Sequence, residues 1–144
     1  MNPNQLTLGC FSLQFEKDGK LKSLSYKDTG ELLNQSDYQF DCGAERVYVP
    51  AGWDECFPTI DPFDDSPVMG DLIGTSSELS FANDAIVQRW DLNNYEAIRK
   101  FTLSGDNVLR VDFSVNNKSL KPIPFLWASH ALFAVDSTDS VLLP

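Results

Sequence analysis

Residues 109–115, with the sequence LRVDFSV, give the clearest structural signal in the chain. Apolar residues stand at every second position: Leu109, Val111, Phe113 and Val115. Successive side chains of a β-strand point to opposite faces, so this alternation predicts a strand with one buried face. Asn116 and Asn117 follow the stretch and indicate a turn. The chain is therefore expected to form β-structure here.

The same two-residue period recurs toward the N-terminus. Residues 11–27 alternate on both sides of Asp18-Gly19, which is a strong turn signal, and predict a hairpin. Residues 79–90 predict a second hairpin with a tight turn near its middle. Because these short strands are separated by turn signals and no amphipathic helix is evident, the expected fold is an all-β antiparallel sandwich. Residues 1–144 are expected to form a single domain.

Two stretches depart from this simple pattern. Residues 49–75 contain four prolines and three glycines without a sustained period, which predicts a long irregular connection. In residues 96–103, Ile98 is out of phase with Phe101 and Leu103, and a β-bulge or burial of both faces would explain it. The chain ends on an apolar stretch, residues 141–144, which predicts that the fold is interrupted there.

Composition narrows the classes of partner. The net charge is −10 and the isoelectric point is about 4.3, so phosphate backbones and anionic membranes would be repelled. No apolar stretch approaches the ~20 residues of a membrane span, and the N-terminus does not resemble a signal peptide. Three widely spaced cysteines, Cys10, Cys42 and Cys56, are expected to be reduced thiols of a cytoplasmic protein. A single histidine argues against a metal site.

Two motifs point to a family. Residues 52–60 (GWDECFPTI) and residues 124–133 (PFLWASHALF) resemble segments of the aldose 1-epimerase, or galactose mutarotase-like, family, and the DTGELL turn at 28–33 resembles the family's opening. The resemblance implies a β-supersandwich with an open cleft that interconverts the α and β anomers of a hexose without a cofactor. Because family domains are much longer, the chain would correspond to the N-terminal half. The family's catalytic base, a glutamate, would then lie beyond Pro144.

The resemblance assigns the catalytic histidine to His130, as the general acid, whereas the period alone favours a buried core histidine. An imidazole suits acid catalysis because it titrates near neutral pH. Trp127, three residues earlier, would face the opposite side of a regular strand, where it would pack in the core or stack on a sugar.

Acidic residues supply the remaining sugar-binding candidates. Asp54 and Glu55 are adjacent, so only one of them can face a cleft from an extended chain; either would accept sugar hydroxyls, or both are solvated loop residues. Asp71 is a weaker candidate. It belongs to Met69-Gly70-Asp71-Leu72, where family members often carry His-Gly-Glu-Leu, so a sugar-contacting histidine is replaced by Met69.

Three functions remain open from the sequence. The first is an anomer-exchanging isomerase, and the second is a non-catalytic carbohydrate-binding domain. The third is an inactive truncated fragment whose exposed sheet edge would associate with other copies. Arg46 and Arg89 could contact a phosphosugar, although surface positions suit them better. The sequence leaves open which sugar is bound.

Overall fold

The computed structural model describes residues 5–27, 29–41, 47–62, 67–82, 84–136 and 139. The secondary structure of these residues consists of strands, turns and loops, without a helix. The strands are β1 (Gln5–Leu8), β2 (Phe11–Phe15), β3 (Leu21–Tyr26), β4 (Phe40–Asp41), β5 (Val47–Tyr48), β6 (Trp53–Cys56), β7 (Glu78–Ala82), β8 (Ala85–Asp91), β9 (Tyr95–Leu103), β10 (Leu109–Asn117) and β11 (Ala128–Ala131).

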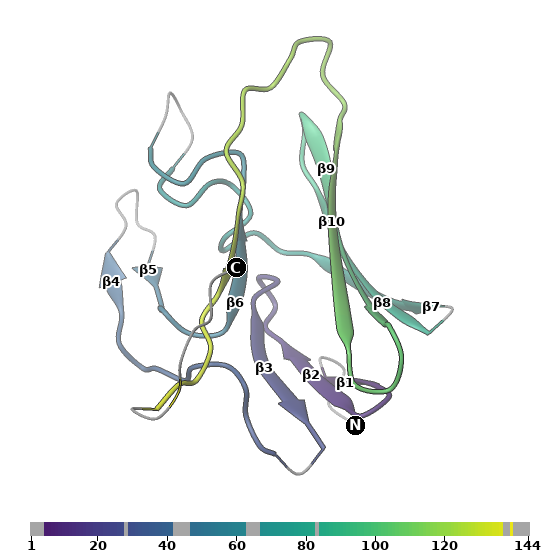
Figure 1. Ribbon diagram of the computed structural model, residues 1–144. Coiled ribbons are helices and arrows are strands. Elements are labelled where there is room, and N and C mark those ends of the chain that lie inside the picture. Colours follow the sequence, from purple (N-terminus) through teal and green to yellow (C-terminus); the bar gives the residue numbers. More distant parts are fainter. Residues whose placement is uncertain are drawn as a thin grey trace.

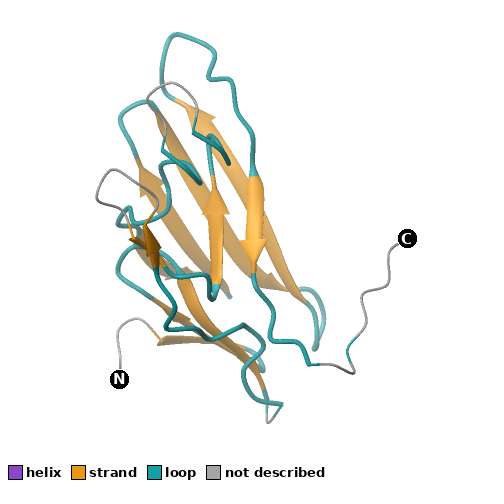
Figure 2. Ribbon diagram, turned by 90° about the vertical axis from the view of Figure 1, so that its left-hand side faces the viewer, coloured by secondary structure: helices purple, strands orange, loops and turns teal. Residues whose placement is uncertain are grey.

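Two antiparallel sheets pack face to face (Figure 1). The first sheet has the order β1-β2-β3-β6-β11 and the second has the order β10-β9-β8-β7. A small ladder of β4 and β5 lies outside the first sheet, on the side turned away from the second (Figure 1). The turned view shows strands and loops only (Figure 2). The prediction of an all-β antiparallel sandwich is confirmed.

The two hairpins predicted from the two-residue period are confirmed. β2 pairs with β3, with Phe11 opposite Tyr26, and β7 pairs with β8. Gly19 forms the first turn with a φ of +88°, in the left-handed region where glycine is favoured. The predicted strand at 109–115 is β10, which pairs with β9 along all nine of its residues.

Of the residues singled out from the sequence, four positions or stretches lie outside the described part: Asp28, Cys42, Arg46 and residues 141–144.

The prediction of an irregular connection over residues 49–75 is wrong in part. It contains β6, which pairs with β3 on one side and with β11 on the other, inside the first sheet. β6 was missed because two of its four residues are the charged pair Asp54 and Glu55, which hides any apolar alternation. Long-range pairing and burial, rather than local sequence, decide this strand.

β9 is regular, so the bulge considered for Ile98 is absent. Its register with β8 and β10 runs without a shift, and Tyr95, Ala97, Arg99 and Phe101 are all buried. Arg99 therefore occupies an inward position between Ala97 and Phe101, while Ile98 lies half-buried on the opposite face. The apparent phase error arose because an arginine stands where an apolar residue was expected.

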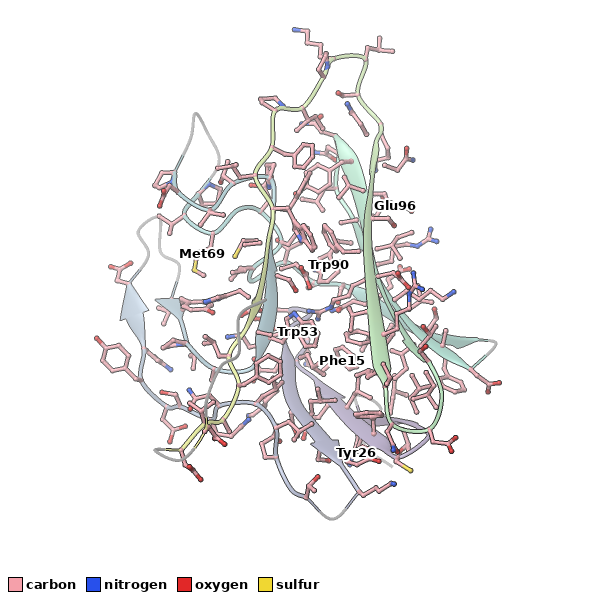
Figure 3. All side chains as sticks on the ribbon, viewed as in Figure 1. Phe15, Tyr26, Trp53, Met69, Trp90 and Glu96 are labelled. Carbon is pink, nitrogen blue, oxygen red and sulfur yellow. The ribbon has the colours of Figure 1, made fainter. Side chains whose placement is uncertain are left out.

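The core lies between the two sheets. Its larger part includes Phe15 and Phe101, whose rings meet edge to face with centroids 5.8 Å apart. A smaller cluster surrounds Phe57, Trp90 and Tyr95. Figure 3 shows Phe15, Trp53 and Trp90 directed into the space between the sheets. In the part of the chain that is described, no helix has the length and apolar character needed to cross a bilayer.

Candidate functional site

The two adjacent carboxylates of β6 lie on opposite faces of the first sheet. Asp54 is opposite His130 of β11 in the antiparallel register, and Glu55 is opposite Ser129. Directly opposed residues share a face of the sheet, so Asp54 and His130 lie on one face and Glu55 and Ser129 on the other. The outer face carries Asp54 and His130, and the inner face looks toward the second sheet.

On the outer face, His130 belongs to a group of four polar residues, here called the His130 cluster: Lys20, Tyr48, Asp54 and His130. The Tyr48 hydroxyl lies 2.9 Å from Nδ1 of His130, and the two rings are stacked at 6.1 Å between centroids. The Lys20 ammonium donates to the carbonyl of Val49 at 2.6 Å and lies 4.5 Å from the centre of the Tyr48 ring. The small β4–β5 ladder therefore supplies Tyr48 as the support of the histidine.

Asp54 is a buried carboxylate, with an exposed fraction of 5%. Burial raises its pKa above the ordinary value, and the nearby charges of Lys20 and Arg99 only partly offset this effect. Lys20 Nζ lies 3.2 Å from Asp54 Oδ2 and forms an ion pair with it in the interior. A buried carboxylate with a raised pKa binds protons more readily than an exposed one.

His130 is half-buried and held through one ring nitrogen. Because Nδ1 is occupied by Tyr48, Nε2 is the nitrogen left for a ligand. When the Tyr48 hydroxyl donates to Nδ1, the neutral ring carries its proton on Nε2 and can donate it. The hydrogen bond to Tyr48 fixes the orientation of the His130 ring. A histidine that only fills space in the core does not require such a bond.

On the inner face, Glu55 is part of a buried ion network that joins the two sheets. Its carboxylate, 2% exposed, lies 3.4 Å from Nη1 of Arg99, a side chain with no exposed surface. Arg99 also donates to Oε1 of Gln88, at 2.7 Å from Nη2, and to the carbonyl of Gly19 at 3.1 Å. The structure therefore places Glu55 in the interior, away from His130.

Trp127 lies at the surface, on the inner side of β11. Its indole Nε1 donates to Glu55 Oε2 at 2.9 Å, and its ring stacks on Phe113 with centroids 5.4 Å apart and planes 1° from parallel. The side chain is 48% exposed, so it does not belong to the core. Trp127 lines an apolar groove of about 330 Å³ together with Phe57, Phe113 and Phe125. Trp127 and His130 thus face opposite ways, as the odd spacing predicted.

Met69 and Asp71 lie on the loop that returns past the end of β6. Met69 has a φ of +63°, unusual for a residue with a side chain, and Gly70 bridges to Phe57. Figure 3 shows Met69 on the side of β6 turned away from β8 and β10, the side on which β5 lies. Asp71 accepts a hydrogen bond of 3.4 Å from the Tyr95 hydroxyl, and burial together with this contact raises the pKa of Tyr95. Asp71 is thereby tied to β9.

Sequence reasoning missed four members of the His130 cluster and the buried ion network: Lys20, Tyr48, Gln88 and Arg99. Lys20 follows a turn, and Tyr48 stands in a short strand, so neither has a local signal of burial. The phase error at Ile98 was the one available hint of Arg99. Within the described residues, no cluster of three or more histidine, cysteine, aspartate or glutamate side chains could hold a metal ion.

Comparisons with known proteins provide no evidence on the function of this chain, so the function has to be argued from the geometry of the site. No family model matches the chain, and no curated protein or solved structure matches it. The resemblance to aldose 1-epimerases therefore stays a prediction from the motifs at 52–60 and 124–133.

The thiols give a direct test of how deeply β6 is buried. Cys10 is exposed and Cys56 is 1% exposed, and both are free. Burial, followed by the charges of Asp54 and Glu55, raises the pKa of Cys56 to about 11. Because the thiolate is the reactive form, Cys56 is expected to resist a thiol reagent at pH 8 until the protein unfolds.

This expectation is measured with a Cys42→Ser variant, in which Cys10 reports the exposed thiol. Cys10 should react at once in the native protein, and Cys56 should react only in denaturant. Equal reaction rates for the two thiols in the native protein would contradict the burial of β6.

Proposed function

We propose that this chain carries the acid side of a sugar-isomerising site of the aldose 1-epimerase kind, with His130 as general acid and a hexose as substrate. The observation that supports the proposal best is the fixed histidine, whose Nδ1 lies 2.9 Å from the Tyr48 hydroxyl and leaves Nε2 for a ligand. The buried carboxylate of Asp54, directly across the ladder, adds an acidic group with a raised pKa to the same face.

The reaction needs two proton transfers and no cofactor. A base takes the proton of the anomeric hydroxyl while His130 Nε2 gives a proton to the ring oxygen, and the bond between the anomeric carbon and the ring oxygen breaks. Rotation about the next carbon–carbon bond and reversal of the transfers close the ring as the other anomer. Each well-placed group contributes on the order of 10²- to 10⁴-fold to such a reaction.

Asp54 is a poor candidate for the base, because its carboxylate is buried and paired with Lys20. In the family that the chain resembles, a glutamate has this role.

A non-catalytic carbohydrate-binding domain is the second candidate. The pairing of Asp54 with Lys20 favours it, because the His130 cluster then offers a ligand one acid and no unpaired base. The replacement of the family's sugar-contacting histidine by Met69 points the same way.

The test is the rate at which fresh α-glucose and α-galactose reach anomeric equilibrium, followed by polarimetry. Because each positioned group contributes separately, His130 with water as the base is expected to accelerate this exchange on the order of 10²-fold, and His130→Ala is expected to lose that acceleration. Tyr48→Phe should lose less, since it removes only the support of the ring. Tyr38→Phe, at a tyrosine that is 67% exposed, serves as the matched control and should leave the rate unchanged.

A binding readout separates the two candidates. His130 is the only histidine, so its imidazole signals in an NMR spectrum need no further assignment. Sugar-dependent shifts of these signals without faster exchange would favour the binding domain. Neither acceleration nor a shift with either sugar would overturn the proposal.

A further inference from the structure

We propose that β10 is a dimerisation strand, which pairs antiparallel with β10 of a second copy about a two-fold axis at Val111. The pairing would join the two second sheets into one continuous sheet. This inference is independent of the proposed function, since the His130 cluster lies on the outer face of the other sheet.

Among the described residues, no strand pairs with the second edge of β10. β10 ends the order of the second sheet, and its nine residues pair with β9 on one side only. Long unpaired edges are templates for pairing with another chain. Apolar side chains gather beside this edge: Val115 is 37% exposed, Phe125 65% and Trp127 48%. Together with Phe113, these three residues line the apolar groove described above.

Geometry limits the registers that a symmetric pair can take. A two-fold axis normal to the sheet keeps the inner face of both copies on the same side, so inward residues must lie opposite inward residues. Leu109, Val111 and Phe113 pack toward the core, and Arg110 and Asp112 point outward. The axis must therefore pass through a residue position, and not between two residues.

Charge selects one of these registers. With Val111 opposite itself, Arg110 of each copy lies opposite Asp112 of the other, which makes two favourable cross-strand pairs. An axis at Arg110 or at Asp112 would instead place like charges directly opposite each other. Within one chain, Arg110 already donates from Nη2 to Asp112 at 2.7 Å, so the dimer would hold four alternating charges. On the inner face, the same register places Leu109 opposite Phe113.

The other edges of the two main sheets, β1, β7 and β11, offer no comparable complementarity. β1 has four residues and no charged one. β7 has five residues and a single charged one, Glu78, and therefore no cation to set opposite it. β11 has four residues, with no partner charge for His130 in its own sequence. β10 combines length, an apolar inner face and a self-complementary outer face, and so the occupant that fits it is a second copy of this chain.

The test is the mass of the protein in solution, measured by sedimentation equilibrium on the wild-type chain and charge-reversed variants. The wild-type chain should be a dimer in equilibrium with monomer. Arg110→Asp and Asp112→Arg should each weaken dimerisation about tenfold or more, because two cross-strand pairs change from attraction to repulsion.

An equimolar mixture of the two variants should regain wild-type association. One variant then carries acidic side chains at both positions and the other carries basic side chains at both, so each cross-strand pair of the mixed dimer again joins opposite charges. Arg89→Asp, which breaks an exposed ion pair between β8 and β9, is the matched control and should dimerise normally.

Three results would overturn the proposal. One is a wild-type chain that stays monomeric at every concentration measured. Another is a dimer whose affinity is unchanged in both charge-reversed variants. The third is a mixture of the variants that associates no better than either alone, which would exclude this register even if each variant folds. Rescue by mixing also shows that both variants are folded.

Discussion

Replacing Arg99 by methionine is expected to lower the free energy of unfolding by about 3–5 kcal/mol. Arg99 has no exposed surface, and its guanidinium lies 3.4 Å from Glu55 and bonds to Gln88 and Gly19. Removing it leaves a carboxylate in the interior without its cation, and leaves the Gly19 carbonyl with one donor fewer. Urea denaturation at neutral pH measures the loss.

Two variants control this experiment. Arg89→Met removes an arginine from an exposed pair with Glu96, and should change the stability by no more than about 0.5 kcal/mol. Glu55→Gln combined with Arg99→Met removes both charges, and should recover part of the loss because no ion remains unpaired. If the double variant were as unstable as the sum of the single changes, the two residues would not be coupled.

Gly70→Ala is expected to destabilise the protein by about 3 kcal/mol or more, from two separate effects. Gly70 has a φ of +77°, which costs a residue with a side chain roughly 1–2 kcal/mol. An added Cβ would also meet backbone atoms of Phe57, including its nitrogen at 2.7 Å, and displacing backbone typically costs a further ~1–3 kcal/mol. The bridge between Phe57 and Gly70 would be pushed apart.

Gly30→Ala is the matched control, because Gly30 has a similar φ of +86° with no atom near the added methyl group. It should show the backbone cost alone. Thermal or urea denaturation of both variants gives the difference. If Gly70→Ala and Gly30→Ala lowered the free energy of unfolding equally, the backbone at Gly70 would not pack tightly against Phe57.

The local pattern of the sequence was sufficient for the elements whose partners are near in the chain. The alternation in 109–115 predicted β10, and the Asp18-Gly19 turn predicted the β2–β3 hairpin. Both signals depend only on residues that are adjacent in the sequence. The same reasoning separated Trp127 from His130, and Asp54 from Glu55, onto opposite faces.

The tertiary structure alone decided the two polar groups. Asp54 meets Lys20 and His130 meets Tyr48 because β6 is inserted between β3 and β11, an order that no local signal encodes. An arginine is expected at the surface from its residue type alone. Arg99 is buried because Glu55 and Gln88, from other strands, compensate its charge. Alternation is a property of one strand, whereas compensation of a buried charge requires knowing which strands become neighbours.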